Sequence, residues 1–204
     1  MVDLDKSNIF APPQTTAAPF QNNAQAVEFF TVAHKKMMIM SIGTLGLYVV
    51  YWFFRQWQAQ KIAHNLSVMP RMRAVFSIFF THALLRRVHE TATAQGIDGG
   101  FQNHKSLATT FVALYVLSSV LSNIANRISG FMAGILFVGY IAAFIYSFMP
   151  LFATQKVINQ LNRDPSGSSN QEITGANIAW LVLGGLTWLV ILFGAFALVM
   201  GIDS

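Results

Sequence analysis

The 204-residue sequence contains no cysteine and few charged side chains. The absence of cysteine excludes disulfide frameworks, thiolate chemistry, iron–sulfur ligation and cysteine zinc sites, and it leaves the redox compartment undetermined. Charged residues make up 10% of the chain, whereas soluble domains average about 25%. With so few charged residues, the net charge of +5 does not indicate a basic surface that binds nucleic-acid phosphates. The composition therefore excludes nucleic acid as a main partner.

Apolar residues are abundant, at 54% of the chain with 18 Phe and nine Met, and the mean hydropathy is +0.49. A soluble domain of this size cannot bury so much apolar surface, so the expected solvent is a bilayer. Three charge-free runs each exceed the roughly 20 residues that cross about 30 Å of hydrocarbon as a helix. They predict transmembrane helices at 106–126, 131–153 and 176–201, the first two forming an antiparallel hairpin.

A fourth apolar segment, residues 37–54, has two interpretations. Its 18 residues could just span the bilayer, and most charge-free runs of that length do span. However, Gly43 and Gly46 divide it, and cations flank both ends. A spanning segment would leave four Lys and Arg on one side and nine on the other, whereas a re-entrant segment would leave only Arg127 outside the cytoplasm. The second split fits the positive-inside rule better. Both interpretations place the C-terminus outside the cytoplasm.

Residues 69–90 contain an uncharged core of 12 residues, which is too short to span, with arginines at both ends. We expect a helix in the cytoplasmic interface whose long cations reach the headgroups. Residues 1–26 are rich in Pro, Gln, Asn, Thr and Ala and predict a flexible arm, and no signal peptide is recognised. The sequence thus predicts an all-α polytopic membrane helical bundle, with residues 27–204 forming a single membrane domain.

Three sequence patterns are distributed along the chain between residues 41 and 162. The first is S-x-x-TxGxYxxYWFxRxW from Ser41 to Trp57, the second is PxxRAxFxxF from Pro70, and the third is P-L-x-x-x-QxxxNxxN from Pro150. Together they resemble a family of uncharacterised bacterial integral membrane proteins, a domain of unknown function. The resemblance implies a bacterial inner-membrane location and a helical bundle. It supplies no activity, cofactor or catalytic residue.

Aromatic and cationic side chains near the predicted cytoplasmic face are candidate contacts for membrane lipid or a partner protein. Tyr and Trp rings suit the headgroup zone, where a ring is partly apolar and partly hydrated. Arginines near the surface attract anionic headgroups by about 1 kcal/mol each. The alternative is that these residues only fix helix depth and topology. The candidates are Tyr48, Tyr51, Trp52, Arg55, Trp57, Arg71, Arg73, Arg86 and Arg87.

Glycines and amides are candidates for close packing and polar bridging. Glycines permit a bend or close helix approach, and a GxxxG pair allows tight packing within the chain or between copies. Three amides at i, i+4 and i+7 share one helix face, where they could bridge segments of the chain or meet a partner. The candidates are Gly43, Gly46, Gly130, Gly134, Gln155, Asn159 and Asn162.

Signals of enzymatic or ion-coupled chemistry are weak. The stretch from His89 to Thr93 begins like the H-E-x-x-H zinc motif but lacks the second histidine. No charged residue lies inside the three predicted spans, whereas ion-coupled transporters usually carry one there. No cofactor, metal site or enzyme activity is predicted.

The predicted function is a non-enzymatic inner-membrane accessory or scaffold protein that packs with other membrane proteins, self-associates or organises anionic lipid. The alternative is a small oligomeric channel or transporter for an uncharged solute, lined by Thr110, Ser122 and Asn123. A third class, a lipid-modifying enzyme, would require His82, His89 and Glu90 to converge, and we do not expect that convergence.

Overall fold

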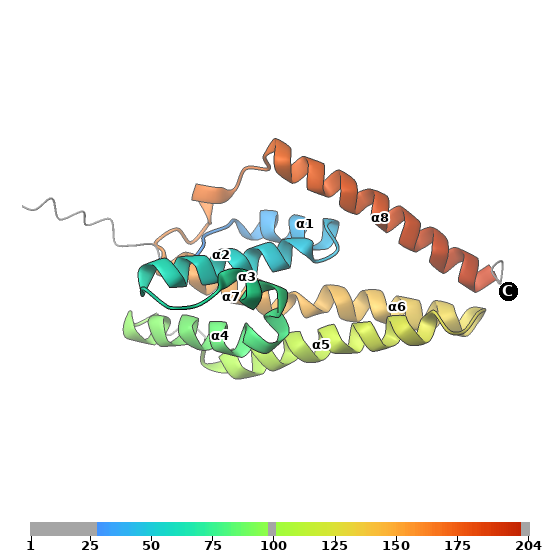
Figure 1. Ribbon diagram of the computed structural model, residues 1–204, viewed down its shortest axis with the longest axis horizontal. Coiled ribbons are helices and arrows are strands. Elements are labelled where there is room, and N and C mark those ends of the chain that lie inside the picture. The colour runs from blue at the N-terminus through green and yellow to red at the C-terminus, as the bar shows by residue number, and fades with distance from the viewer. Residues whose placement is uncertain (1–27, 98–100, 201–204) are drawn as a thin grey trace, which may run out of the picture.

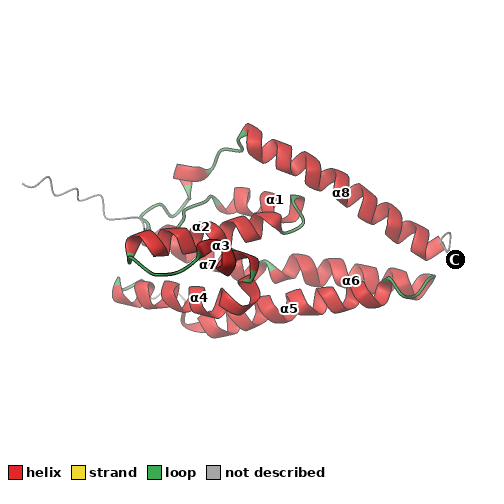
Figure 2. Cartoon of the chain, in the orientation of Figure 1, coloured by secondary structure: helices red, strands yellow, loops and turns green. Residues whose placement is uncertain are grey.

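The computed structural model describes residues 28–97 and 101–200, and within these ranges the chain forms helices and loops without strands (Figure 2). The predicted arm at 1–26 lies outside the described residues. The all-α prediction is confirmed. The elements are α1 (His34–Gly43), α2 (Leu47–Ala63), α3 (Pro70–Val75), α4 (Ser77–Ala94), η1 (Phe101–Asn103), α5 (His104–Ala125), α6 (Phe131–Ser147), α7 (Met149–Leu161), η2 (Ser168–Asn170) and α8 (Gly175–Met200) (Figure 1).

Three helical stretches are long and apolar enough to cross a membrane, namely Phe101–Ala125, Phe131–Leu161 and Gly175–Met200. They coincide with the three predicted spans. The second stretch combines α6 and α7, which lie end to end around Phe148. The turn between α5 and α6 uses Gly130, whose φ of 79° is unfavourable for other residues.

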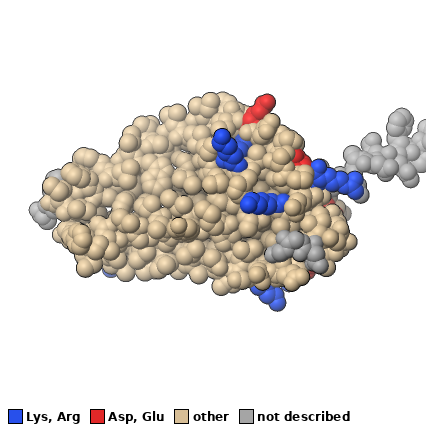
Figure 3. Space-filling model, turned by 180° about the vertical axis from the view of Figure 1, so that it is seen from behind, with Lys and Arg blue, Asp and Glu red and all other residues tan. Residues whose placement is uncertain are grey.

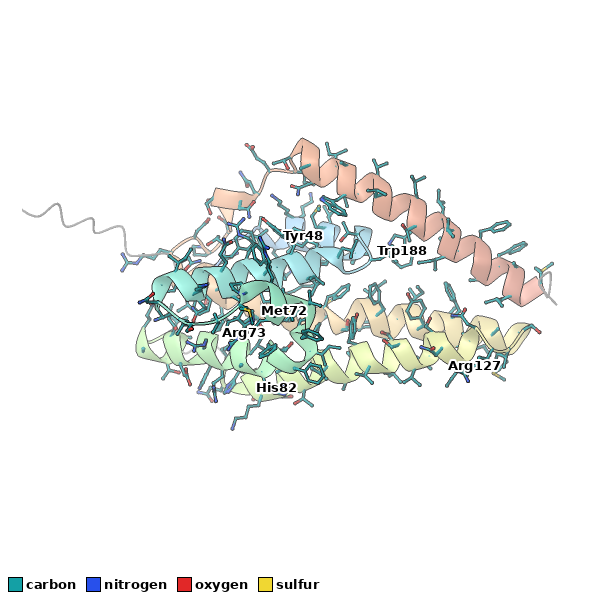
Figure 4. All side chains as sticks on the ribbon, viewed as in Figure 1. Tyr48, Met72, Arg73, His82, Arg127 and Trp188 are labelled. Carbon is teal, nitrogen blue, oxygen red and sulfur yellow. The ribbon has the colours of Figure 1, made fainter. Side chains whose placement is uncertain are left out.

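The two ends of the molecule differ in polarity. The distal end comprises the 126–130 turn and the end of α8, and it holds Arg127 (Figure 4). The opposite end, called the head below, contains α4, α7, most of α2 and the 162–174 loop (Figure 1). In Figure 3, charged side chains gather over the head, at the right of that view. Charge therefore lies mainly at one end of the spanning helices.

Residues 37–54 do not form one continuous helix. The chain reverses between α1 and α2, where Leu45 and Gly46 have φ angles of 52° and 83°. The ten residues of α1 are only about 15 Å long, half the hydrocarbon thickness. Because α1 and α2 run side by side in opposite directions (Figure 1), the segment is a helical hairpin. This is the geometry of the re-entrant alternative.

The predicted interfacial helix at 69–90 is two helices. The backbone leaves helical geometry at Phe76, with φ −95° and ψ 36°, and α4 then continues to Ala94. The single-helix prediction is therefore wrong. The break lets α3 pack against α2 while α4 packs against α5 and α7. Residues 69–79, called the elbow below, carry exposed apolar side chains, namely Met69, Met72, Val75, Phe76 and Phe79.

The hydrophobic core lies largely in the head and the adjoining half of the spanning helices. Its largest fully buried side chains come from α2, α4, α5 and α7 and from the residues around α1. Within this core, the Phe148 ring contacts the Phe144 ring edge to face and the Phe152 ring at a tilt, with centroids 4.9 and 6.4 Å apart. Buried residues of the hairpin and of α4 belong to the same hydrophobic cluster as these rings.

Candidate functional site

An extended segment, residues 28–33, is hydrogen-bonded by side chains of α2, of α7 and of the loop after α7, and is called the strap below. Each of its first five carbonyl oxygens accepts a hydrogen bond from a side-chain amide, at 2.6–3.2 Å. Such bonds satisfy backbone groups that would otherwise be buried without a partner. The pairs, carbonyl first, are Glu28 with Gln60, Phe29 with Asn162, Phe30 with Gln56 and Gln155, Thr31 with Asn170, and Val32 with Asn159.

Gln155 is the centre of this amide cluster. Its side-chain oxygen accepts a hydrogen bond from the Trp52 indole nitrogen at 2.5 Å, and its nitrogen donates to Asn159 at 2.6 Å. Gln155 and Gln56 are completely buried. The structure therefore places all three predicted α7 amides in bridges within the chain. Gln56 and Gln60 were not singled out from the sequence, although their i, i+4 spacing on α2 could have indicated them.

The predicted headgroup positions of Trp52 and Trp57 are wrong, because both rings are 0% exposed. Tyr48 is also buried, whereas Tyr51 is exposed. Within the described residues, the Trp52 indole has a hydrogen-bond partner, whereas the Trp57 N–H is buried without one and only its ring face is covered by a cation. Gln155 accepts the Trp52 N–H, and the Arg73 guanidinium carbon lies 4.2 Å from the Trp57 ring centroid.

The candidate arginines divide into two groups. Arg55 and Arg73 stack on rings of the chain, with Arg55 4.5 Å from the Phe30 centroid. Cation–π contacts of this kind fix the guanidinium in place, and burial lowers the pKa of Arg73. By contrast, Arg71 and Arg86 are exposed, and Arg86 approaches Glu90 at 3.7 Å. Of the candidate arginines, Arg71, Arg86 and the half-buried Arg87 can therefore reach headgroups.

The hairpin and α8 meet at a crossing of two glycines. A Cβ atom on Gly184 would collide with the carbonyl of Gly43, and one on Gly43 would collide with Leu181. Beside this crossing, the Trp188 indole donates to the Ile42 carbonyl at 2.9 Å (Figure 4). Gly43 thus takes part in close packing, as its lack of a side chain suggests. The sequence did not identify Gly184 or Trp188 as its partners.

The remaining candidate glycines have different roles. Gly46 has a positive φ and packs its backbone near Phe144 and Phe148, where a Cβ would lie 3.4 Å from each ring. Gly134 packs against α8, since a Cβ there would lie 3.0 Å from Val199. Gly130 makes no close packing contact. It forms the turn and donates its N–H to the Leu198 carbonyl at 3.0 Å. Packing of Gly130 against another copy stays a prediction.

Lys36 ties the start of α1 to the loop before α8. Its ammonium group donates to the Asn170 side-chain oxygen and the Glu172 carbonyl, both at 2.7 Å. Burial lowers its pKa, and the nearby Glu172 carboxylate opposes that shift. The start of the hairpin is therefore held at the head.

The residues of the less favoured functions do not converge in this chain. Thr110, Ser122 and Asn123 line three separate hollows. His82 contacts Thr109 at 3.1 Å, whereas His89 stacks on His104 with centroids 4.2 Å apart. Among the residues that the structure describes, no group of three His, Asp or Glu is arranged to hold a metal ion.

Helix α8 makes few contacts with the rest of the chain. Only Gly184 and Ala197 of its 26 residues are buried, and its main neighbours are α1 and α6. Many of its other apolar side chains are exposed, Val190 and Phe193 by 71% and 72%. A transmembrane helix of this kind faces lipid or another membrane protein on most sides.

Comparison with models of protein families, with curated proteins and with solved structures found no match. The resemblance to a bacterial membrane family therefore remains a prediction from the three sequence patterns.

Proposed function

We propose that the chain is a non-enzymatic accessory or scaffold protein of the bacterial inner membrane, with its head in the cytoplasm and its C-terminus outside. In this role it packs with other membrane proteins, self-associates or organises anionic lipid. The observation that carries the proposal is the exposure of α8, which buries only two of its residues within the chain. In membranes, such faces associate through close packing rather than through hydrophobic burial.

The exposed arginines of the head support the lipid part of the proposal. Arg71 lies on the elbow and Arg86 on α4, both exposed. Each basic residue near an anionic surface contributes about 1 kcal/mol of attraction. The positive-inside rule places this cationic end in the cytoplasm.

The test is native mass spectrometry of the chain extracted in lipid nanodiscs. We expect an oligomer, a co-purifying membrane protein or retained anionic phospholipid. Arg71→Gln combined with Arg86→Gln should lower the retained anionic lipid, whereas Arg127→Gln removes one cation at the distal end and should leave it unchanged. A strictly monomeric chain without bound protein or anionic lipid would contradict the proposal.

A single cysteine tests the α8 face, since the chain has no native cysteine. Val190→Cys places a thiol on a side chain that is 71% exposed, whereas Ala197→Cys places it where the side chain is 5% exposed. If copies associate through α8, a short bifunctional thiol reagent links copies through position 190 and not through position 197.

A further inference from the structure

The spanning helices set the depth of the bilayer around the molecule. With 26 residues, α8 is about 39 Å long, which exceeds the hydrocarbon thickness of about 30 Å. At the head, α8 begins shortly after Glu172, whose carbonyl accepts a hydrogen bond from the buried Lys36. At the distal end, α8 lies beside the turn that holds Arg127. These charged residues mark the two surfaces between which the apolar stretch lies.

The distal half of the bilayer contains three helices. Here α8 meets the α5–α6 turn, where Gly130 donates to the Leu198 carbonyl at 3.0 Å and Gly134 faces Val199. Among the described residues, no other element reaches this end (Figure 1). The cross-section in this leaflet is therefore that of α5, α6 and the end of α8.

The half nearer the head contains two further helices from the hairpin. The Gly43 carbonyl contacts Gly184, and Gly46 faces Phe144 and Phe148 of the α6–α7 stretch. The hairpin thus lies between α8 and α6, and α8 leans away from α6 toward the head (Figure 1). Gly184 is nine residues into α8, or about 14 Å along its axis. The hairpin therefore enters the half of the bilayer nearer the head, to about 14 Å along the 39 Å of α8, and returns.

The elbow enlarges the same half of the cross-section. His82, four residues after Ile78 on α4, contacts Thr109 at 3.1 Å, and Thr109 is five residues, or about 8 Å, from the head end of α5. Phe76 and Phe79 on the elbow are 47% and 77% exposed. Exposed apolar rings at this depth contact acyl chains of the leaflet nearer the head.

We infer that the membrane domain is a wedge that favours bilayers convex on the side of the head. Each helix occupies a cylinder about 10 Å across, so the hairpin and elbow add at least two helix cross-sections to one leaflet and none to the other. Convex curvature gives that leaflet more area per lipid, and insertion into one leaflet is accordingly sensitive to curvature. The partner is the curved lipid bilayer itself. The inference does not rest on the scaffold function.

The experiment measures how the full chain partitions between a giant vesicle and a membrane tube pulled outward from it. Gln95→Cys provides one dye position on an exposed residue of the head. An impermeant quencher separates copies with the head outside from those with the head inside. Protein density is kept low so that association between copies is not needed.

For copies with the head outside, we expect enrichment in the tube of at least about twofold relative to a lipid dye, rising as the tube narrows. Copies with the head inside should be depleted. Equal densities at every tube radius, or enrichment of copies with the head inside, would overturn the inference and leave the scaffold proposal untouched.

A matched pair of variants tests the depth assignment. Phe76→Ala with Phe79→Ala removes two exposed rings from the leaflet nearer the head, and Phe193→Ala with Phe196→Ala removes two exposed rings from the distal half of α8. The first pair should lower the enrichment and the second should raise it. A change in the same direction for both variants would contradict the leaflet asymmetry.

Discussion

At the scale of single residues, the strap shows how buried amides replace a secondary-structure partner. The strap has no strand beside it, yet five consecutive carbonyls are satisfied by Asn and Gln side chains. The i, i+4, i+7 spacing on α7 predicts that its amides share a face. It does not predict their partners, because the strap is about 125 residues away along the chain, as for Gln155 and Phe30.

The first prediction concerns Gln155. Gln155→Leu leaves the Trp52 N–H without its acceptor and removes one donor from the Phe30 carbonyl. Because each buried unsatisfied group costs about 1–3 kcal/mol, we expect a clear loss of thermal stability in detergent. Gln95→Leu, at an exposed position, is the control and should change stability by less than about 0.5 kcal/mol. Equal effects of the two substitutions would rule out the amide cluster as a source of stability.

The second prediction concerns Asp164 in the loop after α7. Its carboxylate accepts the backbone N–H groups of Ser168 and Ser169, both at 2.9 Å, and these bonds hold its pKa well below the usual range. A carboxyl with a lowered folded pKa stabilises the protein above the unfolded pKa of about 3.9, and this contribution is lost as the pH falls toward the folded pKa. Below about pH 4, the wild type should therefore lose stability faster than Asp164→Asn, as measured by unfolding midpoints between pH 3 and 7. Parallel pH profiles would contradict this role for Asp164.

At the scale of elements, the contact of the hairpin with α8 depends on the absence of two side chains. Sequence patterns identify Gly43 and Gly46 as sites of a bend or a close approach. Whether the segment spans or reverses is decided by the positive φ angles at Leu45 and Gly46 and by the contacts of the turn with Phe144 and Phe148. The adjacent glycines Gly184 and Gly185 of α8 have different surroundings, because only Gly184 lies against the hairpin. Gly185 is therefore a matched control for substitutions at Gly184.

The third prediction compares Gly184 with Gly185. Gly184→Ala forces a methyl group against the Gly43 backbone, whereas Gly185→Ala places it in open space. Overpacking at a close contact costs about 1–3 kcal/mol, but alanine in a free helical position is neutral or stabilising by up to about 1 kcal/mol. Thermal unfolding of both variants in the same detergent measures the difference. If both substitutions have the same effect, the helices do not cross at this glycine.

At the scale of the whole molecule, the described residues form an all-helical protein with three stretches long and apolar enough to span a membrane, and on the face shown in Figure 3 the charge gathers at the head. Both ends of the hairpin lie at the head. Lys36 is bonded to the loop before α8, and Gln60 near the end of α2 is bonded to the strap. We therefore expect that the hairpin adds no crossing to the topology and that the strap lies on the same side of the membrane as α4.

The fourth prediction is the accessibility of single cysteines to an impermeant thiol reagent in oriented membranes. Lys35→Cys and Gln95→Cys should react from the same side, and Ser129→Cys should react from the opposite side, because α5 crosses the bilayer and the hairpin does not. Reaction of positions 35 and 129 from one side would show that residues 37–54 span the membrane.

The sequence by itself determines the helical membrane class, the three spans and the shared face of the α7 amides. These follow from local properties, since hydrocarbon requires long apolar runs and internally bonded backbone. The burial of Trp52 and Trp57, the stacking of Arg73 and the crossing at Gly184 were decided only by the tertiary structure. Each depends on a partner elsewhere in the chain. A Trp or Arg that suits a headgroup equally suits a buried amide or ring, so its position depends on which partner the fold brings near.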